Sequence, residues 1–250
     1  MPDRSLAGSV ALVTGASGCI GAAAAHRLAH EGAAVALVAR RRDRLEHVAN
    51  DILSLGGRAV AVPADITEPD CADQAVQATL DRLGRLDVLV NSAAVMLLDT
   101  ALHTPVKDWE RMIALNVSAL LYITHAAVPY LIDAAATSPR QVADLVNVSS
   151  TAGRVARPAS SAYSLTRFGL AGFTESLRQE LLTERVRVSV VAPGAVDPGF
   201  EGHRGAAGRQ PGGTGSLRPA DVADAIAWIV TREPRVAVNE LLIRGAEQTW

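Results

Sequence analysis

The chain has 250 residues, of which 49% are hydrophobic and 20% charged, with a formal net charge of −2. This near-neutral balance gives no reason to expect nucleic acid or a membrane surface as a partner. The two cysteines, Cys19 and Cys71, are too few for a disulfide framework, and the first residues lack the apolar core of a signal peptide. We therefore expect a cytoplasmic protein with one domain over residues 1–250.

Strands and helices are predicted to alternate along the chain. Short apolar runs predict strands, and amphipathic or alanine-rich runs predict helices. The predicted strands are residues 10–13, 33–39, 59–62, 87–91, 144–150, 187–191 and 240–243. The predicted helices are residues 21–31, 43–55, 70–83, 106–136, 160–183 and 220–230. The helix over residues 106–136 is expected to be interrupted near Pro129, because proline lacks a backbone N–H.

These strands are apolar without polar alternation, so both of their faces should be covered. With helices between them, they predict an α/β fold of Rossmann type, a doubly wound parallel sheet flanked by helices. Residues 198–216 are rich in glycine and poor in apolar residues, which predicts a mobile loop on the substrate side. The most apolar stretch, residues 117–136, contains His125 and Asp133, which favours a buried or interface helix over a membrane span.

A glycine turn follows the first predicted strand and opens the first helix. Its sequence is Thr14-Gly-Ala-Ser-Gly-Cys-Ile-Gly21. A turn of this kind lets the backbone approach a pyrophosphate, whose charge interacts with the N–H groups of the helix N-terminus. An ordinary tight turn is the alternative, but the strand–turn–helix context favours phosphate binding.

A hydroxyl, a phenol and a cation are expected to meet later in the chain. Ser150 ends a predicted strand, whereas Tyr163 and Arg167 are four residues apart on a predicted helix and therefore share a face. A neighbouring positive charge favours the ionised form of a phenol. Taken singly, Ser150 could be a turn residue and Tyr163 a core residue. Together they predict a proton-transfer site beside a bound nucleotide.

In the order of its motifs, the chain resembles the classical short-chain dehydrogenase/reductase family. The residues that match the family pattern are Thr14, Gly15, Gly21, Asp65, Asn91, Asn116, Ser150, Tyr163, Pro193 and Gly194. The ending Asn239-Glu-Leu-Leu-Ile-Arg244 resembles an NADP-preferring subgroup that includes clavulanic-acid-dehydrogenase-like enzymes. This resemblance implies an NADP(H)-dependent oxidoreductase that interconverts a carbonyl and a secondary alcohol.

The resemblance also implies roles for individual residues. Tyr163 would be the general acid or base, Ser150 would polarise the substrate oxygen, and Asn116 would anchor a water. Arg167, in the position of the family's lysine, would hold the ribose hydroxyls. The implied cofactor-binding residues are Gly15, Ser17, Cys19, Ile20, Gly21, Arg40, Arg41, Asp65, Ile66, Asn91, Ala93, Tyr163, Arg167, Pro193, Gly194 and Val196. A homodimer or homotetramer is implied too, built on the helices around Asn116 and after Tyr163.

The end of the second predicted strand indicates which nucleotide is bound. An acidic residue there would bind the ribose 2′-hydroxyl and repel a 2′-phosphate. This chain has Arg40, Arg41 and Arg42 instead, and a guanidinium can pair with phosphate through two hydrogen bonds. Arg40 and Arg41 therefore predict NADP(H). A solvated basic start to the next helix is the alternative, and it suits Arg42.

Four departures from the family pattern keep other functions open. Cys19 replaces the central glycine of the turn, and we expect it to be a small buried residue. Residues 91–94 read Asn-Ser-Ala-Ala, Pro198 replaces a threonine, and Arg167 replaces the lysine. Arginine keeps the charge but does not release a proton near neutral pH. A redox-neutral enzyme (dehydratase, cyclase or isomerase) and a catalytically weak nucleotide-binding protein are the alternatives.

No metal site is expected. His26 and His30 are spaced as two ligands on one helix face can be, but no third ligand is apparent. Zinc sites need three or four protein ligands, so a surface pair is the better interpretation.

Overall fold

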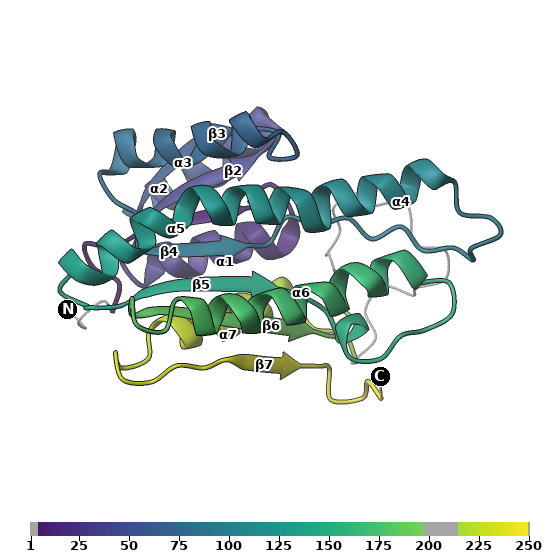
Figure 1. The fold of residues 1–250 in the computed structure, drawn as a ribbon. Coiled ribbons are helices and arrows are strands. Elements are labelled where there is room, and N and C mark those ends of the chain that lie inside the picture. Colours follow the sequence, from purple (N-terminus) through teal and green to yellow (C-terminus); the bar gives the residue numbers. More distant parts are fainter. Residues whose placement is uncertain (1–4, 198–214, 250) are drawn as a thin grey trace.

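The computed structural model describes residues 5–197 and 215–249. Most of the predicted loop over residues 198–216, including Pro198, lies outside these residues. The fold is one parallel sheet with helices on both faces (Figure 1). The strands are β1 (Val10–Thr14), β2 (Ala34–Ala39), β3 (Arg58–Pro63), β4 (Val88–Asn91), β5 (Ala143–Val148), β6 (Val186–Pro193) and β7 (Glu240–Ile243). The predicted single-domain Rossmann-type class is confirmed.

The strand order is β3-β2-β1-β4-β5-β6-β7, and every neighbouring pair is parallel. The order reverses direction between β1 and β4. In open parallel sheets, ligands bind outside the carboxyl ends of the strands at such a switch point. The topology therefore predicts a ligand site beside the ends of β1 and β4.

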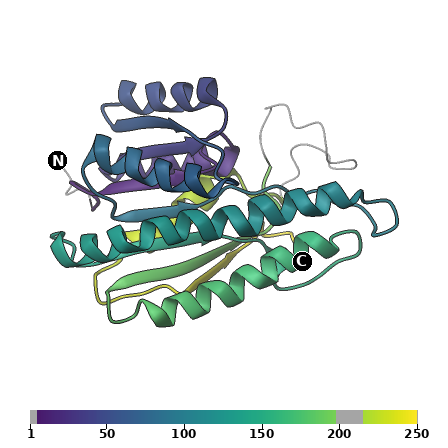
Figure 2. The same cartoon turned by 45° about the horizontal axis from the view of Figure 1, so that its top comes forward.

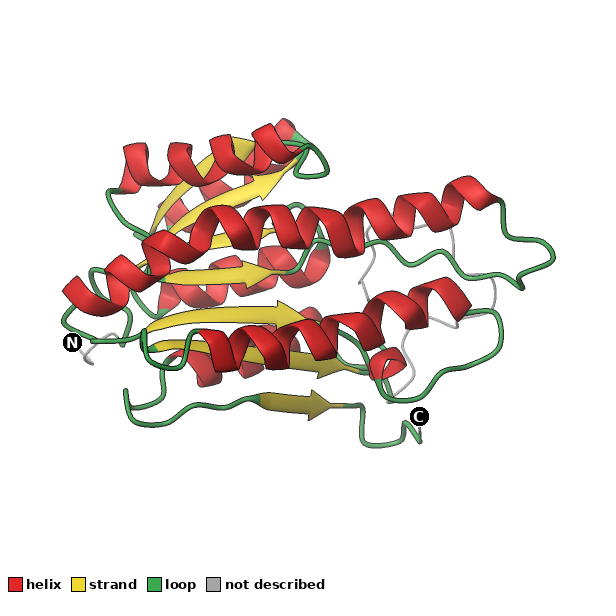
Figure 3. Cartoon of the chain, in the orientation of Figure 1, coloured by secondary structure: helices red, strands yellow, loops and turns green. Residues whose placement is uncertain are grey.

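The helices form two layers, one on each face of the sheet (Figures 2 and 3). One layer contains α1 (Cys19–His30), α2 (Arg42–Ser54) and α7 (Pro219–Val230). The other contains α3 (Pro69–Leu83), α4 (Val106–Ile113), α5 (Ala119–Thr137) and α6 (Ser161–Glu180). All residues of β1, β4, β5 and β6 are buried, which explains why these strands are mostly apolar, although β5 and β6 also bury polar residues such as Asp144 and Arg187.

The long helix is irregular at a different place from the one predicted. The interruption expected near Pro129 is wrong, because α5 continues through that residue. Pro129 and His125 are exposed, so water can satisfy the carbonyl that the missing N–H leaves unpaired. The irregular turn is instead η1 (Ala114–Ser118), a π-helical turn between α4 and α5 that carries Asn116. Such turns frequently occur at functional sites.

The helical run over residues 106–137 is also long and apolar enough, by length and composition, to cross a membrane. Core helices of soluble proteins meet the same criterion, so one such helix is weak evidence for a span. Here Ile123, Ala127 and Leu131 of α5 are fully buried in the core that the helix forms with the sheet.

Candidate active site

The residues singled out in the sequence come from segments that end at one edge of the sheet. Gly15 follows β1, Asn91 ends β4, Ser150 lies two residues after β5, and Gly194 follows β6. Because the strands are parallel, their carboxyl ends share this edge. β5 itself ends at Val148, so the predicted strand is two residues too long, and Ser150 caps the short helix η2 (Thr151–Gly153) instead.

The glycine turn after β1 has geometry that only glycine tolerates. Gly15 has φ +67°, and a Cβ at this position would lie 2.8 Å from the Cα of Ala93. A Cβ on Gly21 would collide with the Gly15 carbonyl oxygen. Gly18, the N-cap of α1, provides no side-chain cap, and the first turn of α1 has no acidic residue. The helix N-terminus is therefore suited to an anion such as a pyrophosphate.

Cys19 is the first residue of α1, and it is exposed. The expectation that it is a small buried residue is therefore wrong. The close contact inside the turn is made by Gly21, two residues later, which packs on the Gly15 backbone. The turn therefore forms with a side chain at position 19.

Thr14 joins the two strands at the switch point, a role that the sequence reasoning missed. Its Oγ1 accepts hydrogen bonds from the N–H groups of Ser92 (3.1 Å) and Ala93 (3.2 Å) and donates to the Val90 carbonyl (3.4 Å). Thr14 is 1% exposed. The available signal was a hydroxyl at the end of an otherwise apolar strand. These bonds fix Ala93 against Gly15, where both were predicted to meet the cofactor.

The two predicted phosphate-binding arginines lie beside other residues of the predicted set. Nη2 of Arg41 donates to the Ser17 carbonyl (3.1 Å), so Arg41 reaches from the end of β2 to the glycine turn. Nη1 of Arg40 lies 3.9 Å from Oδ2 of Asp65. Both arginines are exposed. Ile66, next to Asp65, is buried. The structure therefore brings three separate segments together at one solvent-facing, cationic corner.

Arg167 and Tyr163 lie side by side, as their spacing predicted. The guanidinium carbon of Arg167 is 5.0 Å from the centroid of the Tyr163 ring. Nη1 of Arg167 donates to the carbonyl of Val148, the last residue of β5 (3.2 Å). A Cβ on Gly153 would lie 2.8 Å from the Arg167 carbonyl oxygen, so η2 packs directly on α6. Ser150 caps η2 by accepting the Ala152 N–H (3.1 Å).

The Arg167 side chain is buried without full hydrogen bonding. It is 2% exposed, and within residues 5–197 and 215–249 its Nε and Nη2 have no hydrogen-bond partner. Burying an unpaired charged donor is unfavourable unless an acceptor is provided. Two unpaired guanidinium donors next to a phenol match a ligand that presents hydroxyl oxygens. The residues of this edge thus fit a dinucleotide, with its pyrophosphate at the glycine turn and a ribose at Arg167.

Asn116 holds the segment that follows β4. It is 2% exposed; its Oδ1 accepts the Val95 N–H and its Nδ2 donates to the Val95 carbonyl, both at 2.8 Å. Nδ2 also lies 3.4 Å from Oγ1 of Thr166, which donates to the Tyr163 carbonyl (2.8 Å). Thr166 was not predicted. Through these bonds Asn116 links the segment that follows β4 to the helix that carries Tyr163.

The Asn91 side chain belongs to a buried polar network. Its Nδ2 donates to Oγ1 of Thr124 and to Oδ1 of Asn147, both at 3.0 Å. Asn147 in turn donates to Oγ1 of Thr174 (2.9 Å). This network ties β4 and β5 to α5 and α6 beneath the site. The Asn91 Oδ1 atom is buried and has no hydrogen-bond partner among the described residues.

The Pro193-Gly194 segment is held by the C-terminal end of the described chain. The Gly194 N–H donates to the Ile243 carbonyl, and the Ala195 N–H donates to Oε1 of Gln248, both at 2.8 Å. A Cβ on Gly194 would overlap the Gln248 side chain. Val196 forms a parallel bridge with Leu217. Nothing in the sequence indicated Gln248, because it lies beyond the last predicted strand.

Comparisons with known proteins agree with this geometry. A family model described as short chain dehydrogenase matches residues 9–207. An uncharacterized oxidoreductase of Staphylococcus aureus (strain MRSA252) is 32% identical over 239 residues, which cover 96% of this chain and 98% of that protein.

Solved structures of the same family superpose over nearly the whole chain. A metagenomic short-chain oxidoreductase in complex with NADP is 34% identical, with a TM-score of 0.81 and coverage of 96% and 98% of the two chains. A 3-ketoacyl-(acyl-carrier-protein) reductase from Brucella melitensis complexed with NADH is 29% identical, with a TM-score of 0.85 and the same coverage. Nucleotides of both kinds are therefore found among similar structures.

Proposed function

The chain belongs to the short-chain dehydrogenase family of oxidoreductases, and from this premise we propose that it interconverts a carbonyl and a secondary alcohol with NADP(H). The observation that carries the proposal is the buried Arg167 guanidinium, 5.0 Å from the Tyr163 ring, with two donors unpaired among the described residues. A phenol and a fixed cation at the carboxyl edge of the sheet are suited to proton transfer at a substrate oxygen.

In the proposed reaction, Tyr163 gives its phenolic proton to the carbonyl oxygen during reduction and takes it back during oxidation. Ser150 Oγ already accepts the Ala152 N–H, which leaves its own proton to donate to the same oxygen. Arg167 stabilises the phenolate by its charge, and because it keeps its proton near neutral pH it acts by charge and not as a proton relay.

The nucleotide, when bound, supplies or accepts the hydride. The amides at the start of α1 would hold its pyrophosphate, Arg167 would hold ribose hydroxyls, and the segment from Pro193 to Val196 would line the nicotinamide. Arg40 and Arg41 support NADP(H) over NAD(H), since both are exposed cations at the end of β2.

The substrate side favours an apolar carbonyl compound. Asn116 fixes Val95, and the side chains of Met96 and Leu98, just beyond it, are 48% and 53% exposed. Apolar side chains exposed beside a site lined by a few polar groups are typical of small-molecule pockets.

The test is consumption of NADPH with a panel of aldehydes and ketones of increasing chain length. We expect turnover by the wild type, a loss of at least about 100-fold in Tyr163→Phe, and wild-type rates in Tyr122→Phe, which alters a phenol on α5. Retained turnover in Tyr163→Phe would overturn the assignment of Tyr163 as the general acid. Substrate conversion without any change in NADPH would support redox-neutral chemistry instead. Nucleotide binding without turnover on any substrate would support a catalytically weak binding protein.

We also infer a homodimer or homotetramer built on α5 and α6. Leu121 on α5 and Leu165 and Phe168 on α6 are 39%, 65% and 46% exposed, and the two helices lie side by side (Figures 1 and 2). Exposed apolar side chains on neighbouring helices favour a subunit interface. Sedimentation should give a dimer or tetramer for the wild type and a smaller species for Leu165→Asp. A monomeric wild type would contradict this assembly.

A further inference from the structure

A cavity of about 390 Å³ lies at the amino edge of the sheet, opposite the candidate active site. It is bounded by the end of α6, the start of β6 and the segment over residues 234–239. Four arginines line it, Arg178, Arg185, Arg187 and Arg235, and the described lining contains no aspartate or glutamate. Its volume falls within the range of small-molecule sites.

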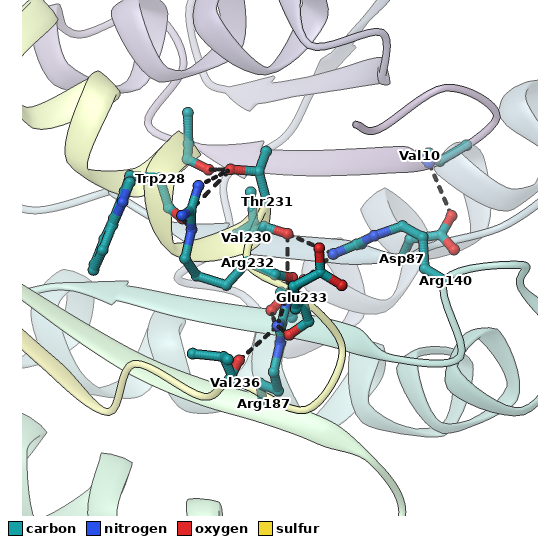
Figure 4. A network of polar contacts seen from close by, with 12 residues as sticks. Val10, Asp87, Arg140, Arg187, Trp228, Val230, Thr231, Arg232, Glu233 and Val236 are labelled. Carbon is teal, nitrogen blue, oxygen red and sulfur yellow. Dashed lines mark hydrogen bonds and ion pairs between the residues drawn. The ribbon is translucent and has the colours of Figure 1, made fainter. Parts of the chain in front are cut away.

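Two of the four arginines already form ion pairs within the protein, which hold their side chains in place. Arg187 makes a bidentate ion pair with Asp144 (2.8 and 3.0 Å), and its Nη1 donates to backbone carbonyls that include that of Val236 (Figure 4). Arg178 makes a bidentate pair with Glu175 (2.8 and 2.7 Å), which lowers the pKa of that carboxyl to about 2. These two charges are neutralised within the protein.

The other two arginines have no such partner. The side chains of Arg185 and Arg235 are exposed, and within residues 5–197 and 215–249 neither forms an ion pair or a side-chain hydrogen bond. Arg185 has φ +57°, in the left-handed region that favours glycine. Gln141, which also lines the cavity, has φ +54°. Polar side chains are thus present at two turns where glycine would be the less strained choice.

The rest of the lining is largely aliphatic and includes Leu182, Val186 and Pro234. A ligand that matches this surface carries a compact anionic group and an apolar body. Two guanidinium groups without internal partners favour a dianion, because guanidinium and phosphate pair through parallel hydrogen bonds.

We propose that this cavity is a second binding site that takes an organic phosphate monoester. Its phosphate lies between Arg185 and Arg235, and its aliphatic chain packs on Leu182 and Pro234, which are exposed apolar residues of the lining. The site uses residues at the amino ends of β5 and β6, whereas the nucleotide site uses the carboxyl ends. Binding here is therefore independent of the nucleotide.

The test is calorimetric titration of the full chain with hexyl phosphate, compared with inorganic phosphate, hexanoate and hexanol. We expect saturable binding of hexyl phosphate, at least about tenfold weaker binding of each other probe, and no change when NADPH is saturating. Equal binding of hexanol would show that the arginines contribute nothing. Competition with NADPH would show that hexyl phosphate binds at the nucleotide site instead. Either result would overturn the proposal.

Single substitutions test whether Arg185 and Arg235 bind the phosphate. Arg235→Gln and Arg185→Gly should each weaken hexyl phosphate binding by about tenfold. Arg185→Gly should also raise the melting temperature, since glycine accepts a positive φ, so lost binding in this variant cannot be attributed to unfolding. Arg58→Gln, which removes an exposed arginine at the amino end of β3, is the matched control and should bind as the wild type does. Wild-type affinity in both test variants would refute the site.

Discussion

Arg167 and Tyr163 form a buried pair, with the guanidinium carbon 5.0 Å from the phenol ring centroid and one guanidinium nitrogen bonded to the Val148 carbonyl. The arrangement fixes a positive charge beside the phenol and anchors both to the end of β5. A purely structural arginine would be expected to use its remaining donors within the protein. Nε and Nη2 of Arg167 find no partner among the described residues, and we therefore expect a ligand to complete the site.

Replacing Arg167 with methionine distinguishes a ligand-binding arginine from a purely structural one. Methionine fills similar volume without a charge, so removal of an incompletely paired buried cation should leave the free energy of unfolding unchanged or raise it by about 1–2 kcal/mol. Activity should fall by at least about 100-fold, because the phenolate loses its neighbouring charge. Urea unfolding and initial rates measure the two effects. A large loss of stability would instead assign Arg167 a structural role.

The conservative variant Arg167→Lys is expected to keep or increase activity. Lysine retains the positive charge, carries a smaller head group and can also bind hydroxyl oxygens. Initial rates at saturating NADPH are the measurement. Activity as low as that of Arg167→Met would mean that the planar guanidinium itself, rather than its charge, is required.

Asn116→Ala should lower both the stability of the protein and its activity. It leaves the N–H and carbonyl of Val95 without their side-chain partner, which should lower the free energy of unfolding by about 2 kcal/mol. We expect kcat to fall while NADPH affinity changes little, since Val95 lies on the substrate side. Thr79→Val, which removes a buried hydroxyl on α3 remote from the site, is the control for stability loss alone. Unchanged kcat in Asn116→Ala would limit Asn116 to a structural role.

The double substitution Arg40→Ala/Arg41→Ala tests the nucleotide preference. Loss of charge-assisted hydrogen bonds to a 2′-phosphate should weaken NADPH binding by about 10- to 100-fold and leave NADH binding unchanged. Arg42→Ala is the matched control, because Arg42 is exposed and pairs with Glu46 on its own helix (3.7 Å). If the binding of NADPH and of NADH weakens equally, the two arginines do not recognise the 2′-phosphate.

Gln248→Ala should loosen the segment that begins at Gly194. The Ala195 N–H would lose its acceptor, and the space beside Gly194 would open. We expect NADPH affinity to fall by several-fold, with little change in melting temperature, because the contact lies at the end of the described chain. Gln179→Ala, which alters a glutamine on the far end of α6, should have no effect on affinity. Unchanged affinity in Gln248→Ala would show that this contact does not order the nicotinamide segment.

Much of the fold could be predicted because its strands are buried on both faces. Every residue of β1 and β5 is buried, and both strands are mostly apolar, as strands of a parallel sheet covered on both faces usually are. The Tyr163–Arg167 pair could be predicted from helical periodicity alone. The π-helical turn at Asn116 could not be predicted, because the apolar pattern continues through it. A break was expected at Pro129 instead.

The parts of the site that could not be predicted depend on contacts between residues distant in sequence. Gln248 meets Ala195 across 53 positions, and Thr14 meets Ala93 across 79. Cys19 was misjudged because its exposure depends on the direction in which α1 leaves the turn. The family pattern pointed to candidate residues, whereas the tertiary structure determined what each one contacts.

The most direct measurement is a fluorescence titration of the purified protein with NADPH and NADH, which tests whether the carboxyl edge of the sheet binds a dinucleotide and prefers NADP(H). We predict saturable NADPH binding at least about tenfold tighter than NADH binding, because Arg40 and Arg41 add contacts to the 2′-phosphate. Binding of neither nucleotide would contradict the account and would exclude nicotinamide-dependent hydride transfer as the function of this chain.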